Sequence, residues 1–418
     1  MGDYILKGNI IYSNTKENLT LIRDGYVVCE GQLCRGAYSR FPDQYQDFEL
    51  IDYGDCLIIP GMTDLHVHAP QYTVCGYAMD LELMDWLNAY IFPEEARYAD
   101  FHYAKTSYSR FVTDLVHSPT TRVCAFGTLH SRATLELMRQ LEEAGLIGYV
   151  GKVSMDRNAP ANLCETHGKE DLLQWLEQCH FPHIRPILTP RFIPACSDEL
   201  MTAIGEIQKE THLPLQSHLS ENPLEIRFVR ELCPESEFYG DAYDHFGTFG
   251  TGGRTIMAHC VYSDDRETER MKQNQVYVAH CPESNFNLSS GIAPTRKFLN
   301  AGLNMGLGTD IGAGTSVSMF RSIREAIIAS KMYWRLIDSE MAPLQFAEAF
   351  YLATLGGGTF FGKAGSFQDG YEFDAVILDD RKVREPVPDR LENRLERLIY
   401  ADDCRTVEAK YISGRKVL

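Results

Sequence analysis

Eight apolar runs that are typical of β-strands alternate with helical segments through the middle of this chain, and this alternation limits the possible folds most strongly. The helical segments include residues 131–144, 170–178 and 198–210, and the apolar runs span residues 62–68, 122–127, 147–155, 185–192, 213–219, 255–262, 275–280 and 303–309. Such alternation favours parallel strands wrapped by helices. We therefore predict an α/β fold in which residues 60–365 form a (β/α)8 barrel of the TIM type.

The two ends of the chain differ from the middle. They contain short strand-like runs broken by Gly, Asn and Asp, at residues 4–12, 19–29, 49–52, 373–378 and 410–414. We expect residues 1–59 together with 366–418 to form one small β-sandwich domain beside the barrel. The simpler alternative is two unrelated β extensions.

Composition and charge favour a small-molecule partner. The chain has 418 residues, of which 44% are hydrophobic, and a formal net charge of -18. This charge disfavours binding to nucleic acid or to an anionic membrane surface. We find neither a secretion signal nor a transmembrane run, and the 12 cysteines include no Cys-x-x-Cys pair, so we expect a soluble cytoplasmic protein with reduced thiols.

A pair of histidines stands at the end of the first predicted barrel strand. His66 and His68 are two residues apart, so the alternation of strand side chains points both imidazoles to one face. Leu65 and Val67 then pack on the other face. This arrangement is suited to binding one divalent cation.

Three further strand ends carry side chains that bind metals. His218 ends the fifth strand, His259 ends the sixth and Asp310 ends the eighth. Histidines with a carboxylate suit zinc or ferrous iron and leave a coordination position for water. The bound metal ion lowers the pKa of that water towards about 7. A single strand-end histidine is more often a satisfied buried residue, and we interpret His280 on the seventh strand as structural or supporting.

Glu221 follows His218 by three residues, where the chain leaves the fifth strand. A carboxyl group beside the metal but not bound to it could shuttle protons, and Glu221 is well placed to do so. The alternative is a helix cap, because Pro223 favours a helix start just after it.

Together these residues resemble the amidohydrolase superfamily of metal-dependent hydrolases. The resemblance rests on Pro60-Gly61-x-x-Asp64-x-His66-x-His68, His218, His259 and Gly308-Thr309-Asp310. Finer motifs are similar to the guanine deaminase branch, namely Ala69-Pro70-Gln71-Tyr72, Thr189-Pro190-Arg191-Phe192, His218-Leu219-Ser220-Glu221-Asn222 and His280-Cys281-Pro282-Glu283-Ser284-Asn285. The fourth strand has no lysine of the kind that binuclear members carry, so the resemblance implies a mononuclear site.

The resemblance implies one Zn²⁺ per subunit, with Fe²⁺ as the alternative, held by His66, His68, His218 and Asp310. His259 would hydrogen-bond the attacking water, Glu221 would protonate the purine ring, and Asp310 would receive the proton of the water. The substrate would be guanine, also contacted by His218, Glu221 and Asp310, and the products xanthine and ammonia. A homodimer is expected as well.

Recognition of a purine requires hydrogen-bond donors for its carbonyl and ring nitrogens. Gln71 and Arg191 are our candidates, and Phe192 and Trp86 could cover the ring face. Alternatively, Arg191 pairs with a carboxylate such as Asp156 or Glu221.

Two other functions stay open from the sequence. One keeps the metal site but acts on another aminated heterocycle, such as cytosine, a modified adenosine or a triazine. The other is a non-catalytic assembly protein on the same fold. The Pro-Cys-x-x-Cys element of the cytidine-type deaminases is absent, since no second cysteine closely follows Pro282-Glu283.

Overall fold

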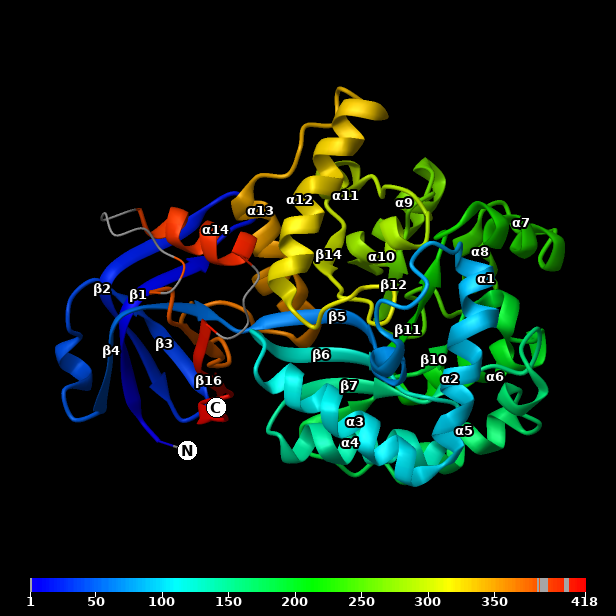
Figure 1. The fold of residues 1–418 in the computed structure, drawn as a ribbon, viewed down its shortest axis with the longest axis horizontal. Coiled ribbons are helices and arrows are strands. Elements are labelled where there is room, and N and C mark those ends of the chain that lie inside the picture. The colour runs from blue at the N-terminus through cyan, green and yellow to red at the C-terminus, as the bar shows by residue number, and fades with distance from the viewer. Residues whose placement is uncertain (1, 382, 384–389, 402–405) are drawn as a thin grey trace.

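The eight predicted strands of the middle region are present and are arranged in chain order (Figure 1). This structure, a computed structural model, describes residues 2–381, 383, 390–401 and 406–418. One four-stranded parallel sheet contains β5 (Met62–His68), β6 (Thr120–Phe126), β7 (Ile147–Gly151) and β9 (Ile184–Pro186). The other contains β11 (Leu215–Leu219), β12 (Thr255–His259), β13 (Tyr277–His280) and β14 (Asn304–Leu307).

The third and fourth predicted strands are each broken in two. The short pair β8 (Val153–Ser154) and β10 (Thr189–Pro190) forms a separate two-stranded parallel sheet beyond β7 and β9. The break in the fourth strand has a physical reason, because Leu188 turns to the next sheet. Its amide donates to the carbonyl of Pro214 at 2.9 Å, and its carbonyl accepts from Gln216 at 2.9 Å.

Hydrogen bonds also join the last strand to the first. The amide of Asp310 donates to the carbonyl of His66 at 2.8 Å, and the amide of His68 donates to the carbonyl of Ile311 at 3.0 Å. The two sheets are therefore connected along both of their outer strands. The side chains of β6 are buried throughout, as expected for strands covered on both faces.

Helices follow most of these strands, and local sequence determines where several of them begin. The predicted segments 131–144, 170–178 and 198–210 correspond to α4 (Ser131–Glu143), α5 (Gly168–Leu176) and α6 (Asp198–Thr211). The side chain of Ser197 caps α6 by accepting from the amide of Leu200. Further helices are α1 (Leu83–Trp86), α2 (Phe92–Ala96), α3 (Phe101–Val116), α7 (Pro223–Leu232), α8 (Tyr239–His245), α9 (Asp265–Gln273), α10 (Pro282–Asn287), α11 (Thr295–Ala301), α12 (Met319–Leu336), α13 (Phe346–Tyr351) and α14 (Leu391–Ala401).

Both ends of the chain contribute to one further sheet, so the alternative of two unrelated extensions is wrong. Its order is β17-β16-β15-β4-β1-β2-β3. The strands are β1 (Tyr4–Ser13), β2 (Leu19–Glu30), β3 (Leu33–Tyr38), β4 (Glu49–Pro60), β15 (Ala375–Leu378), β16 (Val407–Ile412) and β17 (Arg415–Lys416). Figure 1 shows the blue N-terminal strands next to the red β16, beside β5, β6 and β7.

We expected a sandwich of two sheets at this end, but the described strands form a single seven-stranded sheet. The reason is the length of β4, which pairs in parallel with β1 and in antiparallel with β15. β4 then leads directly into β5. Gly61 at this junction has no room for a side chain, because a Cβ atom would lie 2.1 Å from the hydroxyl of Thr121.

A buried ion pair links the terminal sheet to β6. The guanidinium group of Arg122 donates to Asp374 at 2.6 Å and to Glu372 at 2.8 Å. Asp374 also accepts from the hydroxyl of Thr121 and from the amide of Ser413, so its carboxylate is shared by β6 and the turn after β16. Burial without these partners would be costly for either charge.

The described part of the chain can be compared with two other expectations. All of its cysteines are free thiols, as expected. None of its helices is long and apolar enough to cross a bilayer.

We expect Arg122→Ala to lower the free energy of unfolding by about 3 to 5 kcal/mol, because it leaves the carboxylate of Asp374 buried without its charge partner. Denaturant unfolding measures this loss. The control is Arg230→Ala on the exposed face of α7, which should change stability by less than about 0.5 kcal/mol. Equal effects of the two variants would contradict a specific role for the ion pair.

Candidate metal and active site

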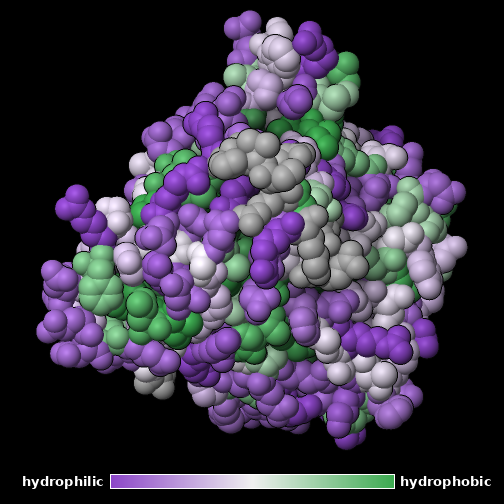
Figure 2. Space-filling view, turned by 60° about the vertical axis from the view of Figure 1, so that its left-hand side comes forward, coloured by the Kyte–Doolittle hydropathy of each residue, from purple (hydrophilic) through white to green (hydrophobic). Residues whose placement is uncertain are grey.

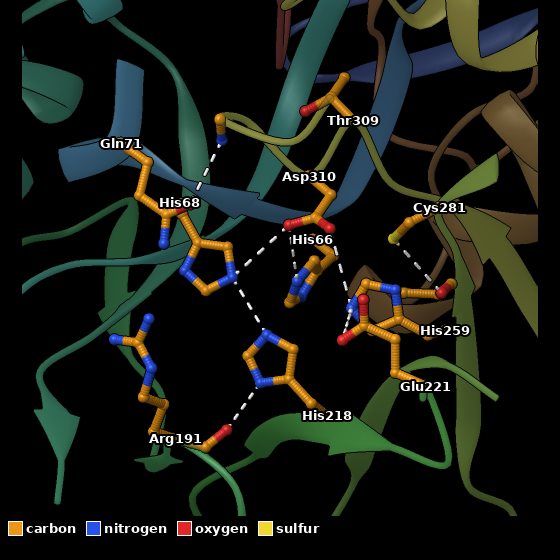
Figure 3. Close-up of polar contacts among 12 residues, drawn as sticks. His66, His68, Gln71, Arg191, His218, Glu221, His259, Cys281, Thr309 and Asp310 are labelled. Carbon is orange, nitrogen blue, oxygen red and sulfur yellow. Dashed lines mark hydrogen bonds and ion pairs between the residues drawn. The ribbon is translucent and has the colours of Figure 1, made fainter. Parts of the chain in front are cut away.

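The strand-end histidines and Asp310 meet at one point in the structure (Figure 3). The Nε2 atoms of His68 and His218 lie 3.1 Å apart. Asp310 Oδ1 lies 3.3 Å from Nε2 of His66 and 3.5 Å from Nε2 of His68. Two overlapping groups can hold a metal ion, one of His66, His68 and His218 and the other of His66, His259 and Asp310.

The state of these side chains fits a metal ion. Neither ring nitrogen of His66 has a hydrogen-bond partner among the described residues, although the side chain is fully buried. Burial and the neighbouring His66 hold the pKa of His68 and His218 well below the usual range, so both imidazoles are neutral. Neutral imidazoles with unused lone pairs are the ligands that zinc and ferrous iron prefer.

The orientation of His218 is fixed by a backbone group. Its Nδ1 donates to the carbonyl of Arg191 at 2.6 Å, which leaves the lone pair of Nε2 pointing into the cluster. Asp310 completes the set as an anion. Burial opposes its ionisation, but the charges of His66 and His259 lower its pKa well below the usual value.

The buried carboxylate of Asp64 joins the strands that carry this cluster. It accepts hydrogen bonds from the amide of His66 at 3.1 Å and from the amide of Thr309 at 3.0 Å, and a third from the hydroxyl of Thr309. Burial raises its pKa to about 7. Asp64 belongs to the motif quoted above, but its hydrogen-bond partners could not be predicted from that motif.

His259 faces two carboxylates. Its Nδ1 contacts Oδ1 of Asn285 at 2.9 Å, while its Nε2 lies 3.5 Å from Glu221 and 3.7 Å from Asp310. Burial lowers the pKa of His259, but the two carboxylates outweigh this and raise it above the usual value. Asn285 was not among the predicted site residues, and its only signal was its place in the motif at 280–285.

Glu221 lies in the pocket and is not a helix cap. The cap of α7 is Asn222, whose side chain accepts from the amide of Leu224. Ser290 donates to Oε1 of Glu221 at 3.1 Å, and burial raises the pKa of Glu221. Glu225, another residue that the sequence did not indicate, accepts from the amide of Glu221 at 3.1 Å.

All four predicted recognition residues line the same pocket. Its walls are His68, Gln71, Leu83, Trp86, Leu87, Arg191, Phe192, His218, Glu221, Glu225, His259, Leu288, Asp310 and Ala313. Trp86 belongs to α1 (Leu83–Trp86), in the long segment between β5 and β6. Tyr77 and Tyr90 of the same segment are exposed instead.

Arg191 pairs with a carboxylate that the sequence did not indicate. Its Nη1 donates to Glu95 at 2.6 Å. Neither suggested alternative partner is used, since Asp156 accepts from the backbone and hydroxyl of Ser197 and Glu221 faces His259. Glu95 also accepts from Gln71 at 2.9 Å, so it contacts both predicted recognition residues.

The backbone is strained where the strands enter the site. Ser220, His259, Cys260 and Asp310 have φ angles of 47°, 73°, 52° and 49°. Residues other than glycine rarely adopt this left-handed region, and such strain is concentrated at functional sites. The turn after each strand thus redirects the chain sharply at the cluster.

His280, which we interpreted as structural or supporting, lies outside the cluster, as does its neighbour Cys281. The thiol of Cys281 is directed to the carbonyl of Ala279, and neither Cys281 nor His280 belongs to a metal-holding group of the described residues. Nε2 of His280 lies 3.3 Å from the hydroxyl of Thr295. Burial and the charge of His259 lower the pKa of His280 to about 3.

Comparison with known proteins places this arrangement in a family. Residues 57–417 match the amidohydrolase family. A guanine deaminase of Dictyostelium discoideum is 38% identical over 381 residues, covering 88% of this chain and 84% of that protein. One from Escherichia coli is 32% identical over 417 residues, covering 96% and 91%.

A solved structure is also very similar. The crystal structure of guanine deaminase from C. acetobutylicum with bound guanine in the active site has a TM-score of 0.97, is 44% identical and covers 100% of both chains. The chain therefore belongs to the amidohydrolase family, and within that family to the guanine deaminases.

The buried imidazole of His280 should make the protein acid-labile. Above its usual pKa of 6.5, His280 is neutral whether the chain is folded or not, and it contributes nothing to the pH dependence. Between 6.5 and about 3 only the unfolded chain binds the proton, so stability falls by up to about 1.4 kcal/mol per pH unit.

We expect His280→Gln to weaken the loss of unfolding free energy between about pH 6 and pH 4, measured by denaturant unfolding. The control is His117→Gln, which replaces an exposed histidine and should leave the slope unchanged. If the unfolding free energy of His280→Gln falls with pH as steeply as that of the parent protein, the imidazole of His280 can take up a proton in the folded state.

Proposed function

We propose that this chain catalyses the hydrolytic deamination of guanine to xanthine and ammonia. The observation that carries this proposal is the pocket in which Gln71, Arg191 and Glu221 converge on the metal-type cluster. The similarity to a guanine deaminase with bound guanine, at 44% identity over the whole chain, supports it. The chemistry of the individual residues follows from their contacts.

The cofactor is one Zn²⁺ per subunit, with Fe²⁺ as the alternative, and His66, His68, His218 and Asp310 would hold it. The neutral imidazoles of His68 and His218, and the ring nitrogens of His66 that make no hydrogen bond to a described residue, support this ligand set. The chemistry that such a cation supplies is a nucleophilic water at neutral pH. His259 is not a ligand in this proposal, because its Nε2 is directed to Glu221 and Asp310.

Three side chains of the chain move or hold protons. Water adds its oxygen to the carbon that bears the exocyclic amine of guanine, and the bond from that carbon to the amine breaks. Glu221, whose raised pKa suits a proton donor, protonates the adjacent ring nitrogen. Asp310 takes one proton of the water and passes it to the departing amine, which leaves as ammonia. The second proton of the water returns to Glu221 when the new carbonyl forms, and His259 donates a hydrogen bond to the attacking oxygen.

The purine would lie between an aromatic and a polar wall. Arg191 and Gln71 supply N–H donors for its carbonyl oxygen and ring nitrogens, and both are buried, which makes an unpaired donor costly. Phe192 and Trp86 cover the ring with about 1 kcal/mol per aromatic contact. His218, Glu221 and Asp310 contact the reacting side of the ring.

The fold supports a closed (β/α)8 barrel over residues 60–365 and a separate domain made of residues 1–59 with 366–418. The hydrogen bonds of Leu188 to the fifth strand and of Asp310 to the first support closure. The shared sheet of both termini supports the separate domain.

The protein would act as a cytoplasmic homodimer. The free thiols of the described cysteines suit a reducing compartment. Figure 2 shows apolar side chains at the projecting end of α12, where Ile328, Met332 and Leu336 form one exposed stripe along the helix. Such a stripe favours a second copy as its cover, which the molar mass in solution tests.

The activity is tested by ammonia release from a panel of aminated purines, pyrimidines and triazines. We expect guanine to give the highest kcat/KM, because Arg191 and Gln71 face its acceptor atoms. Higher activity on cytosine, a modified adenosine or a triazine would contradict the assignment of guanine as the substrate, but not the proposed mechanism. A protein purified without zinc or iron and without activity would instead revive the non-catalytic alternative.

We expect Glu221→Gln to retain the metal and to lose about 10² to 10⁴-fold in kcat, because the amide cannot donate the proton that the ring requires. Metal analysis and steady-state kinetics measure the two effects separately. Glu237→Gln, at an exposed position, is the control and should keep full activity. An active Glu221→Gln enzyme would eliminate the proposed shuttle.

A further inference from the structure

Glu95 lies behind the polar wall of the pocket, which the side chains of Gln71 and Arg191 form. It belongs to the short helix α2 (Phe92–Ala96), is 2% exposed and is not among the residues that line the pocket. Each of its two carboxylate oxygens accepts one hydrogen bond, Oε1 from Gln71 at 2.9 Å and Oε2 from Arg191 at 2.6 Å. The ring of Phe92 on the same helix lies 5.3 Å below the guanidinium group of Arg191.

The contact with Glu95 determines which end of the Gln71 amide faces which partner. A carboxylate only accepts hydrogen bonds, so the NH₂ group of Gln71 must face Glu95. The amide oxygen then faces the backbone N–H of Gly312 at 3.4 Å. The oxygen of Gln71 is thus directed to the protein backbone, and the group left for a ligand is the second N–H.

Arg191 adds only donors to this wall, because a guanidinium group has no acceptor. Figure 3 shows the terminal groups of Gln71 and Arg191 turned toward each other on one side of His68 and His218. The polar wall therefore offers N–H groups alone. A ring carbonyl satisfies it, whereas an amino group at the same position would set donor against donor.

We propose that Glu95 is a positioning residue that determines substrate specificity, because it fixes this wall as donor-only and so selects a purine with a carbonyl at C6 over one with an amino group there. The proposal rests on the proposed function, since it assigns the base that the pocket accepts. It adds a residue that does not touch the purine and acts through Gln71 and Arg191.

The neighbouring Glu94 provides a matched control. It is on the same helix and is similarly buried, at 4% exposed. Its partners are Thr73, Tyr103 and Arg97, none of which lines the pocket. Replacing Glu94 therefore removes a comparable buried carboxylate without changing the polar wall.

The experiment compares the binding of hypoxanthine and adenine by calorimetry to the metal-loaded protein. Neither base carries an amine at C2, so neither is deaminated there. They differ in the group at C6 and in the proton that hypoxanthine carries on N1. We expect the parent protein to prefer hypoxanthine by about tenfold or more, which corresponds to about 1.4 kcal/mol, since adenine would leave a buried donor mispaired. No preference in the parent would overturn the proposal.

In Glu95→Gln the new amide can donate to the oxygen of Gln71, which allows the Gln71 amide to reverse. We expect the preference for hypoxanthine to fall about tenfold while metal content is retained, and Glu94→Gln to keep the parental preference. An unchanged preference in Glu95→Gln, or an equal loss in Glu94→Gln, would overturn the proposal.

Two further measurements separate the possible failures. If Glu95→Gln does not fold, Glu95→Asp is measured instead, because it keeps an acceptor-only group. We expect it to keep the preference for hypoxanthine over adenine, with weaker binding of both. A folded Glu95→Asp protein without this preference would overturn the proposal. Ammonia release from guanine by the parent protein is measured alongside. Its absence would refute the proposed function, whereas the binding preference still tests the role of Glu95.

Discussion

The carboxylate of Asp64 is the interaction on which the geometry of the site depends. It is buried between the first and the last strand of the middle region and accepts from His66 on one side and from Thr309 on the other. Because a buried carboxylate is costly without such donors, the two strands are held in one register. The same register brings His66, on β5, and Asp310, just after β14, to within 3.3 Å.

The proposed metal site and the polar wall of the pocket meet at Arg191. Its carbonyl accepts from Nδ1 of His218 and so orients a proposed ligand, while its side chain contacts Glu95 at the pocket wall. A shift of the chain at Arg191 would therefore disturb both functions together. Arg191 directly follows β10, so its carbonyl faces His218 on the fifth strand while its side chain reaches Glu95 on α2.

The sequence allowed us to predict the strand-end cluster because its geometry is local. The spacing of His66 and His68 follows from the period of a strand, and the placement of His218, His259 and Asp310 follows from the end of each apolar run. Glu95 and Asn285 could not be predicted in this way. Glu95 meets Arg191 across a separation of 96 residues, and Asn285 meets His259 across 26, so both contacts exist only once the fold is complete.

The single sheet at the termini has a consequence for how the chain is made. β4 pairs on one edge with β1, but its other edge is completed only by β15, more than three hundred positions later in the sequence. During synthesis, Leu57, Ile58 and Ile59 therefore present an apolar strand edge without a partner while the rest of the polypeptide emerges. Unpaired strand edges of this kind can pair with the same edge of another nascent chain. This edge of β4 therefore stays open until residue 378 has left the ribosome.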